Sequence, residues 1–166
     1  MVTAVLASAA GANATDISGT ITATLTIFGN SKLTGDVTCQ VTSAPCIVVQ
    51  NPFAFVTRTT LDLNGFTITG QADPQTACSG GGANSSETGI LVTGQSGVVI
   101  RGPGIVQQFR GFGISLSGVT DSTVTAVTTA TNCFSGIFVT GGSARNLLDG
   151  NVSIRNGNIT NPCGGI

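Results

Sequence analysis

Residues 61–70 read LDLNGFTITG and set a pattern that returns further along the chain. With Leu61 as the first position, apolar residues fall at the first, third and eighth positions. The same frame fits segments that begin at Val98 and Val152, and more weakly one that begins at Val124. A strand-like frame that recurs along a chain predicts a protein built from stacked copies of one structural unit.

A six-residue motif with glycine at both ends alternates with this frame. Its copies span residues 89–94, 113–118 and 136–141, so that successive copies start 24 and 23 residues apart. Residues 46–51 are a degenerate earlier copy. Within each copy the apolar residues lie two apart, which is typical of a strand with one buried face and one solvent-facing Thr or Ser face. Two strand motifs per repeat predict that each repeat is one coil of a solenoid and that coils pair in parallel, about 4.8 Å apart.

The predicted fold class is all-β: a single-stranded parallel β-helix, or solenoid, of about five coils. The stretch TLDLNGFTITG, followed by coils that contain Gly-Ile, resembles the N-terminal region of right-handed parallel β-helices of the pectate-lyase-like superfamily. The resemblance covers roughly residues 20–166. It implies a right-handed, secreted β-helix, and it says little about activity because this scaffold hosts many functions.

One domain accounts for most of the 166 residues. Residues 1–14 are interpreted as the remnant of a signal peptide, because residues 2–10 are small and apolar and residues 12–14 have the form of a signal-peptidase site. Residues 15–166 are expected to form the β-helix domain, with an inserted polar loop at 71–88 and an incomplete C-terminal coil. The expected location is secreted or at the cell surface, and no stretch approaches the roughly 20 apolar residues of a membrane span.

The charge balance excludes one class of partner. Six basic and seven acidic residues leave no basic face for nucleic acid. The chain also has no His, Trp or Tyr. It therefore lacks the most common general base and the aromatic residues that many sugar-binding sites use as platforms.

Five cysteines occur without the spacing of a metal site. Cys39 and Cys46 enclose a short turn and could close a small loop. The coil register places Cys133 and Cys163 on adjacent coils, one residue out of step, so a bridge between them is feasible. Cys78 is then left over, or pairs in a way that the sequence does not assign.

An acidic pair is the first candidate site. Asp121 and Asp149 each precede a frame start by three residues, so the register predicts two carboxylates about one coil spacing apart, near the separation found in retaining glycosidases. Such a pair could act in acid–base catalysis or bind Ca²⁺. The competing interpretation is that both aspartates serve turn geometry through side-chain to backbone hydrogen bonds. No other metal or cofactor is expected.

Four polar residues are the candidate ligand-binding residues: Asn64, Arg101, Arg110 and Arg155. An arginine can bind the carboxylate of an acidic sugar bidentately. The alternative is that isolated arginines on a Gly-rich surface promote solubility. Asp62 is expected to have no partner on a neighbouring coil.

The resemblance also bears on activity. Pectate lyases of this superfamily use acidic calcium ligands with an Arg or Lys base, and the related polygalacturonases use three Asp with a His. The absence of His and the single lysine, Lys32, depart from both patterns. The leading expectation is an exported, non-catalytic module that binds a polysaccharide or cell-surface glycan. The alternatives are a polysaccharide lyase or glycoside hydrolase, and a structural subunit that associates end to end through open coil edges.

Overall fold

The computed structural model describes residues 15–51, 58–71, 78 and 82–157, and every regular element in these residues is a β-strand. No helix in this part of the chain is long and apolar enough to cross a membrane. The expected signal-peptide remnant and the expected incomplete end of the chain lie outside the described residues.

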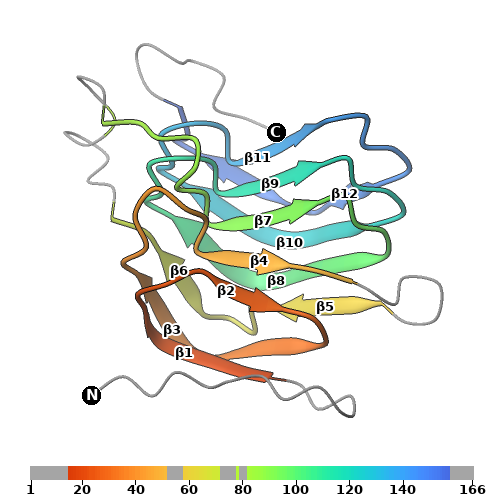
Figure 1. The fold of residues 1–166 in the computed structure, drawn as a ribbon, viewed down its shortest axis with the longest axis horizontal. Coiled ribbons are helices and arrows are strands. Elements are labelled where there is room, and N and C mark those ends of the chain that lie inside the picture. The colour runs from red at the N-terminus through yellow and green to blue at the C-terminus, as the bar shows by residue number, and fades with distance from the viewer. Residues whose placement is uncertain (1–14, 52–57, 72–77, 79–81, 158–166) are drawn as a thin grey trace.

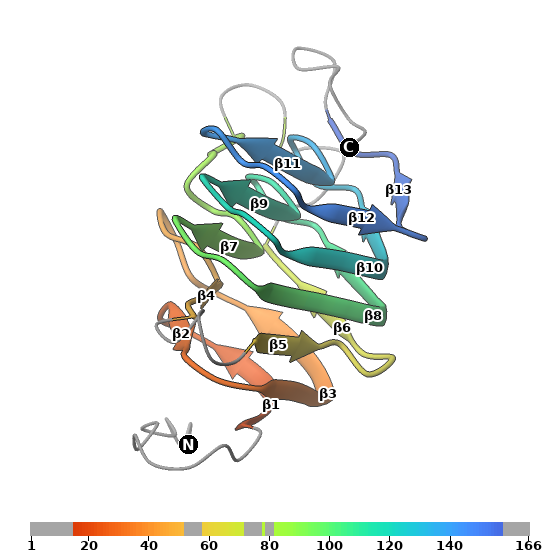
Figure 2. The ribbon, with the colours of Figure 1, turned by 90° about the vertical axis from the view of Figure 1, so that its right-hand side faces the viewer.

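The strands form two parallel sheets (Figure 1). The larger sheet contains β1 (Thr15–Ile21), β3 (Ser31–Cys39), β5 (Thr59–Asp62), β6 (Thr67–Thr69), β8 (Val98–Gln107), β10 (Thr123–Ala130), β12 (Leu147–Asp149) and β13 (Val152–Ile154). The smaller sheet contains β2 (Leu25–Ile27), β4 (Ile47–Val49), β7 (Ile90–Thr93), β9 (Ile114–Ser117) and β11 (Ile137–Thr140). Along the chain, segments of the larger sheet alternate with single strands of the smaller one (Figure 2). The all-β class and the parallel pairing are therefore confirmed.

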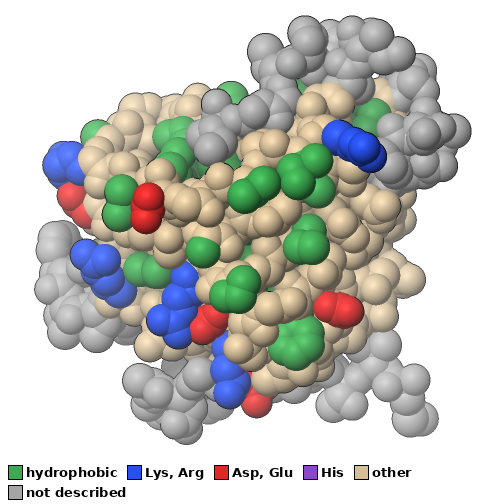
Figure 3. All heavy atoms as spheres, turned by 180° about the vertical axis from the view of Figure 1, so that it is seen from behind, with side chains coloured by type: hydrophobic (Ala, Val, Ile, Leu, Met, Phe, Trp, Pro, Cys, Tyr) green, Lys and Arg blue, Asp and Glu red, His purple; other side chains and the backbone are tan. Residues whose placement is uncertain are grey.

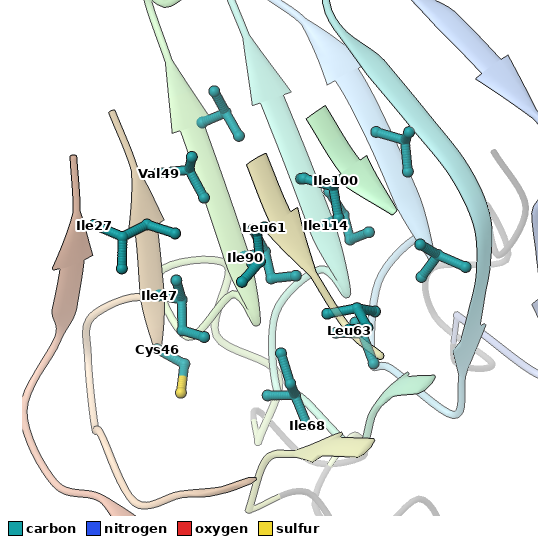
Figure 4. Close-up of a cluster of buried hydrophobic side chains, with 14 of the residues drawn as sticks. Ile27, Cys46, Ile47, Val49, Leu61, Leu63, Ile68, Ile90, Ile100 and Ile114 are labelled. Atoms are coloured by element: carbon teal, nitrogen blue, oxygen red, sulfur yellow. The ribbon is translucent and has the colours of Figure 1, made fainter. Parts of the chain in front are cut away.

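The six-residue motif supplies the strands of the smaller sheet, in the register that the sequence predicts. Ile114 pairs with Ile90 on one side and with Ile137 on the other, and Ile90 pairs with Ile47. All four side chains are fully buried and belong to one hydrophobic cluster with residues of the larger sheet, such as Leu61 (Figure 4). The expected interior column of isoleucines is confirmed, including the degenerate copy at residues 46–51.

The expected register of the larger sheet is wrong by an even number of residues. Leu61 and Val124 both pair with Ile100, not with Val98, and Val152 pairs with Thr128. A shift of two or four residues leaves the same side chains facing inward, so apolar alternation cannot distinguish these registers. A bulge in β8, where Gly102 and Pro103 lie opposite Ala126 alone, also shifts the pairing of β8 with β10.

Asparagine side chains connect successive repeats where the chain turns. The Oδ1 atoms of Asn146, Asn151 and Asn156 each accept a hydrogen bond from the backbone N–H 24 residues earlier, at 3.0 Å in all three cases. Their Nδ2 atoms donate to the carbonyl 27 residues earlier, at 2.7, 2.8 and 3.0 Å. A carboxamide has both a donor and an acceptor, so it can pair with backbone groups that lack a strand partner. These bonds fix the turns of adjacent repeats against each other.

The structure confirms one expected cysteine pairing and corrects the other. Cys39 and Cys46 form a disulfide, with a Cα–Cα distance of 6.0 Å. Cys133 is bonded to Cys78, with a Cα–Cα distance of 5.1 Å, so Cys78 is not left over and the expected bridge from Cys133 to Cys163 is wrong. The physical reason is that residue 78, within the inserted loop, packs against the turn that contains Cys133. Two disulfides fit an oxidising environment.

The first glycine of the six-residue motif is required by close packing between repeats. A Cβ atom at Gly113 would lie 2.6 Å from the carbonyl oxygen of Gly136, whereas a Cβ at Gly29 would meet nothing within 4 Å. We predict that Gly113→Ala lowers the free energy of unfolding by about 1–3 kcal/mol because the backbone must move apart. Gly29→Ala, the matched control, is expected to change it by less than about 1 kcal/mol. Urea denaturation measures both, and equal midpoints for the two variants would contradict the packing argument.

The disulfide pattern is tested by peptide mapping without reduction. Mass spectrometry is expected to find the peptides of Cys39 and Cys46 linked to each other, and those of Cys78 and Cys133 linked to each other. Reduction before digestion is the control, since it should release all four peptides. A linked peptide that joins Cys133 to Cys163 would show that the described pairing is wrong.

Candidate functional site

The acidic pair expected from the sequence does not share a register position. Asp149 pairs across strands with Thr125, and Asp121 forms a bidentate salt bridge with Arg145, with both N–O distances at 2.7 Å. The hydrogen bond from the Arg145 guanidinium holds the pKa of Asp121 below its usual value. Asp121 also has a φ of 53°, which supports a role in turn geometry. The register that was expected to stack these two carboxylates is therefore wrong, because residue 145 occupies the place assigned to residue 149.

Charged side chains of the larger sheet instead form a column across the strands, on the outward side of the residues that build the core. Strand pairing brings together, in order, Asp16, Lys32, Asp62, Arg101, Thr125 and Asp149. Arg101 donates to the Asp62 carboxylate from Nη2 at 2.6 Å and from Nε at 2.9 Å, which corrects the expectation that Asp62 has no partner. Positive and negative side chains lie side by side on the face shown in Figure 3.

The four candidate ligand-binding residues are held by different parts of the fold. Asn64 donates from Nδ2 to the carbonyl oxygen of Leu33 at 3.0 Å, so its amide helps to join two strands. Arg101 is bound to Asp62, and Arg155 lies exposed after β13 at a φ of 52°. Arg110 donates to the carbonyl oxygen of Gly82. The structure thus assigns structural contacts to three of the four residues.

Glu87 is a buried carboxylate that joins two turns of the chain. Its Oε1 atom accepts hydrogen bonds from the backbone N–H of Ser43 at 3.0 Å and from Nδ2 of Asn84 at 3.2 Å. Its Oε2 atom lies 3.6 Å from Nε of Arg110, and only 7% of the Glu87 side chain is exposed. A buried charge of this kind is tolerated because two hydrogen-bond donors and the nearby Arg110 guanidinium replace its water. Glu87 therefore fixes the turn around Ser43 against the turn that ends the inserted loop.

A groove of about 320 Å³ lies between these two turns. It is bounded by the starts of β4, β7 and β9, which are neighbours in the smaller sheet. The lining residues are uncharged, and five of them carry a hydroxyl group. They are Ser43, Ala44, Pro45, Ser85, Ser86, Thr88, Leu91, Phe112 and Ser115.

Phe112 is held in place by two other aromatic rings. Its ring stacks on that of Phe138, with centroids 4.4 Å apart and an interplanar angle of 8°. The ring of Phe134 lies 5.1 Å away and is tilted by 36°, and Phe134 itself packs against the Cys78–Cys133 disulfide. An aromatic side chain fixed on two sides is a preorganised apolar wall for the groove.

The sequence does not predict this groove. The chain lacks Trp and Tyr, but it contains eight phenylalanines, of which Phe112 supplies the aromatic wall. The six-residue motif does indicate part of the groove. The third residues of its copies, Leu91, Ser115 and Phe138, pair on adjacent strands, so two apolar side chains and a serine lie on one face. The turns that form the walls gave no such signal.

The described residues contain no group of three or more His, Cys, Asp or Glu side chains that could hold a metal ion. A Ca²⁺ site at Asp121 would also have to compete with the guanidinium of Arg145, which already binds both carboxylate oxygens.

The role of Glu87 in joining the two turns can be tested by substitution. Glu87→Gln retains the shape of the side chain but loses its charge. It is expected to lower the free energy of unfolding by about 1–3 kcal/mol, since the donors of Ser43 and Asn84 then bond to a weaker acceptor and Arg110 loses its ion pair. Asp16→Asn makes the same change in an exposed pair and is expected to cost less than about 0.5 kcal/mol. Chemical denaturation measures both. Equal stability of the two variants would show that Glu87 does not hold the turns together.

Comparisons with known proteins assign no function to this groove. No protein-family model, no curated protein and no solved structure matches the chain. The function of the groove has to be argued from its own chemistry.

Proposed function

We propose that this chain is an exported, right-handed parallel β-helix of the pectate-lyase-like kind, and that it binds a glycan without cleaving it, through the groove between the Ser43 turn and the Ser85–Thr88 turn. Support for the winding comes from the alternation of strands between the two sheets and from pairing at intervals such as Ile90 to Ile114 and Ile114 to Ile137. Support for export comes from the two disulfides.

The observation that carries the proposal is the combination of hydroxyl groups and one fixed aromatic ring in the groove. A sugar ring presents apolar C–H faces and a rim of hydroxyl groups. Phe112, Leu91 and Pro45 offer apolar contact area for such a face. The serine hydroxyls can both donate and accept hydrogen bonds, and the Thr88 hydroxyl, which donates to the Ser85 carbonyl, can still accept one. Binding sites for small molecules commonly combine these two kinds of group.

The walls of the groove are held in place before any ligand arrives. The Cys39–Cys46 disulfide closes the turn that contains Ser43, and Glu87 binds the backbone of Ser43 from the opposite wall. The opposite wall is itself closed by the hydrogen bond from the Thr88 hydroxyl to the Ser85 carbonyl at 3.0 Å. Preorganised walls lower the ordering cost of binding, which favours a role in recognition.

A non-catalytic role fits the residues around the groove. Its described lining carries no carboxylate, no cationic group and no thiol that could act as acid, base or nucleophile. The Glu87 carboxylate is engaged within the protein, through two hydrogen bonds to Oε1 and the Arg110 guanidinium beside Oε2. Cleavage by a lyase or hydrolase, and end-to-end association of copies, remain predictions from the sequence.

The proposal is tested by binding to a panel of soluble polysaccharides, with affinity electrophoresis as a screen and calorimetry on the binders. We expect at least one polysaccharide to bind without release of reducing ends or unsaturated products. Phe112→Ala is expected to weaken that binding at least about tenfold, because the apolar wall is lost. Phe28→Ala is the matched control, since Phe28 is 52% exposed and does not line the groove.

A second variant separates loss of binding from loss of folding, because Phe112 also packs against Phe138. Ser86 is exposed on the rim, so Ser86→Trp should narrow the groove and reduce binding while the circular dichroism spectrum stays unchanged. The proposal fails if the wild-type protein binds no polysaccharide in the panel, or if both groove variants bind as tightly as the wild type.

A further inference from the structure

We infer that the groove takes a short, uncharged segment of glycan and not an acidic sugar such as a uronate. This inference rests on the proposed function and adds the class of ligand to it. It departs from the acidic polysaccharides that the superfamily resemblance implies.

The lining of the groove offers no charge to an anionic ligand. All nine lining residues are uncharged, and their polar side chains are hydroxyls. A hydroxyl can replace one water of a carboxylate but supplies no opposite charge, so a uronate would lose hydration in the groove without compensation. A neutral sugar hydroxyl exchanges one hydrogen bond to water for one to Ser or Thr and carries no such penalty.

Most basic side chains of the protein are already paired with acids and lie outside the groove lining. Recognition of a carboxylate usually requires an Arg or Lys, with a bidentate guanidinium as the strongest form. Four of the six basic residues already pair with an acid: Lys32 with Asp16, Arg101 with Asp62, Arg110 with Glu87, and Arg145 with Asp121. The other two, Arg58 and Arg155, do not line the groove.

Glu87 makes the groove less favourable for an anion. Its carboxylate lies directly behind one wall, where Oε1 accepts the N–H of Ser43 at 3.0 Å. The N–H group of Ser43 is therefore already hydrogen-bonded to the Glu87 carboxylate and is not available to an anionic ligand. The Arg110 guanidinium lies next to the other oxygen of Glu87 and donates to Gly82, so it is also engaged.

The size of the groove limits the length of the segment. A volume of about 320 Å³ lies at the lower end of the roughly 300–1,000 Å³ that ligand sites usually have. The groove crosses the starts of three adjacent strands, which spans two strand spacings, or about 10 Å. This is room for a short segment of a polysaccharide, bound across the strands.

The inference is tested with two sets of oligosaccharides of equal length, neutral gluco- and manno-oligosaccharides and oligogalacturonates. Calorimetry on the full chain is expected to give at least about tenfold tighter binding for a neutral oligosaccharide. That affinity should change less than about twofold between low salt and about 0.5 M NaCl, because binding without ion pairs is not screened.

A charge placed on the rim provides the matched variant. Ser86→Arg should raise the affinity for oligogalacturonate at least about fivefold at low salt, since it supplies the missing cation beside the groove. Thr93→Arg adds the same charge at an exposed position that does not line the groove, and it should have little effect. If both variants bind oligogalacturonate equally weakly, the groove is not where the sugar binds and the inference is overturned.

The remaining outcomes separate this inference from the proposed function. The wild-type protein could bind oligogalacturonate more tightly than any neutral sugar, with an affinity that falls as the salt concentration rises. That result would overturn the inference of a neutral ligand but would still support glycan binding. Wild-type protein that binds neither set, nor any polysaccharide of the panel, would overturn the proposed function itself.

Discussion

The pairing of parallel strands between successive repeats is the interaction on which the rest of the structure depends. Each strand in the middle of a sheet uses its backbone groups on two neighbours, and buried backbone groups must find partners because desolvation is costly. Where the chain turns and no strand is available, the amides of Asn146, Asn151 and Asn156 take over this pairing. Among the described residues, no buried polar side-chain atom lacks a hydrogen-bond partner. The fold therefore satisfies its backbone from repeat to repeat, with an apolar column at its centre.

The same pairing builds the groove from distant parts of the chain. Since β4, β7 and β9 are adjacent, the turns that precede them meet at one edge of the smaller sheet. The Cys78–Cys133 disulfide fixes Cys78, and the Glu87 carboxylate holds the Ser85–Thr88 turn against this edge. This turn belongs to the long segment between β6 and β7. Here it supplies a wall of the candidate site.

The pairing of strands and turns also decides which charged side chains lie next to each other. Strand register sets Asp62 beside Arg101, and the adjacent turns set Asp121 beside Arg145. Exposed pairs such as these contribute little to stability, but opposite charges on neighbouring strands favour the native register over one in which like charges meet. Because most of the few basic side chains are used in this way, the groove on the smaller sheet is left without a cation. Its neutrality is a consequence of how the chain distributes a small number of charges.

The sequence by itself determined the all-β class, the inward faces of the strands and the column through Ile90, Ile114 and Ile137, because alternation and paired glycines are local features that recur at a fixed interval. It also indicated the Cys39–Cys46 bridge, which closes a short loop. Only the tertiary structure decided the register of the larger sheet, since a slip of two residues leaves every side chain on the same face. A slip of four residues separated Asp121 from Asp149, and a slip of two brought Asp62 to Arg101. The groove also could be found only in the tertiary structure. Its walls are joined by the side chain of Glu87, whose partners Ser43 and Arg110 lie 44 residues before and 23 residues after it in the chain. The repeat pattern of the sequence does not predict such contacts.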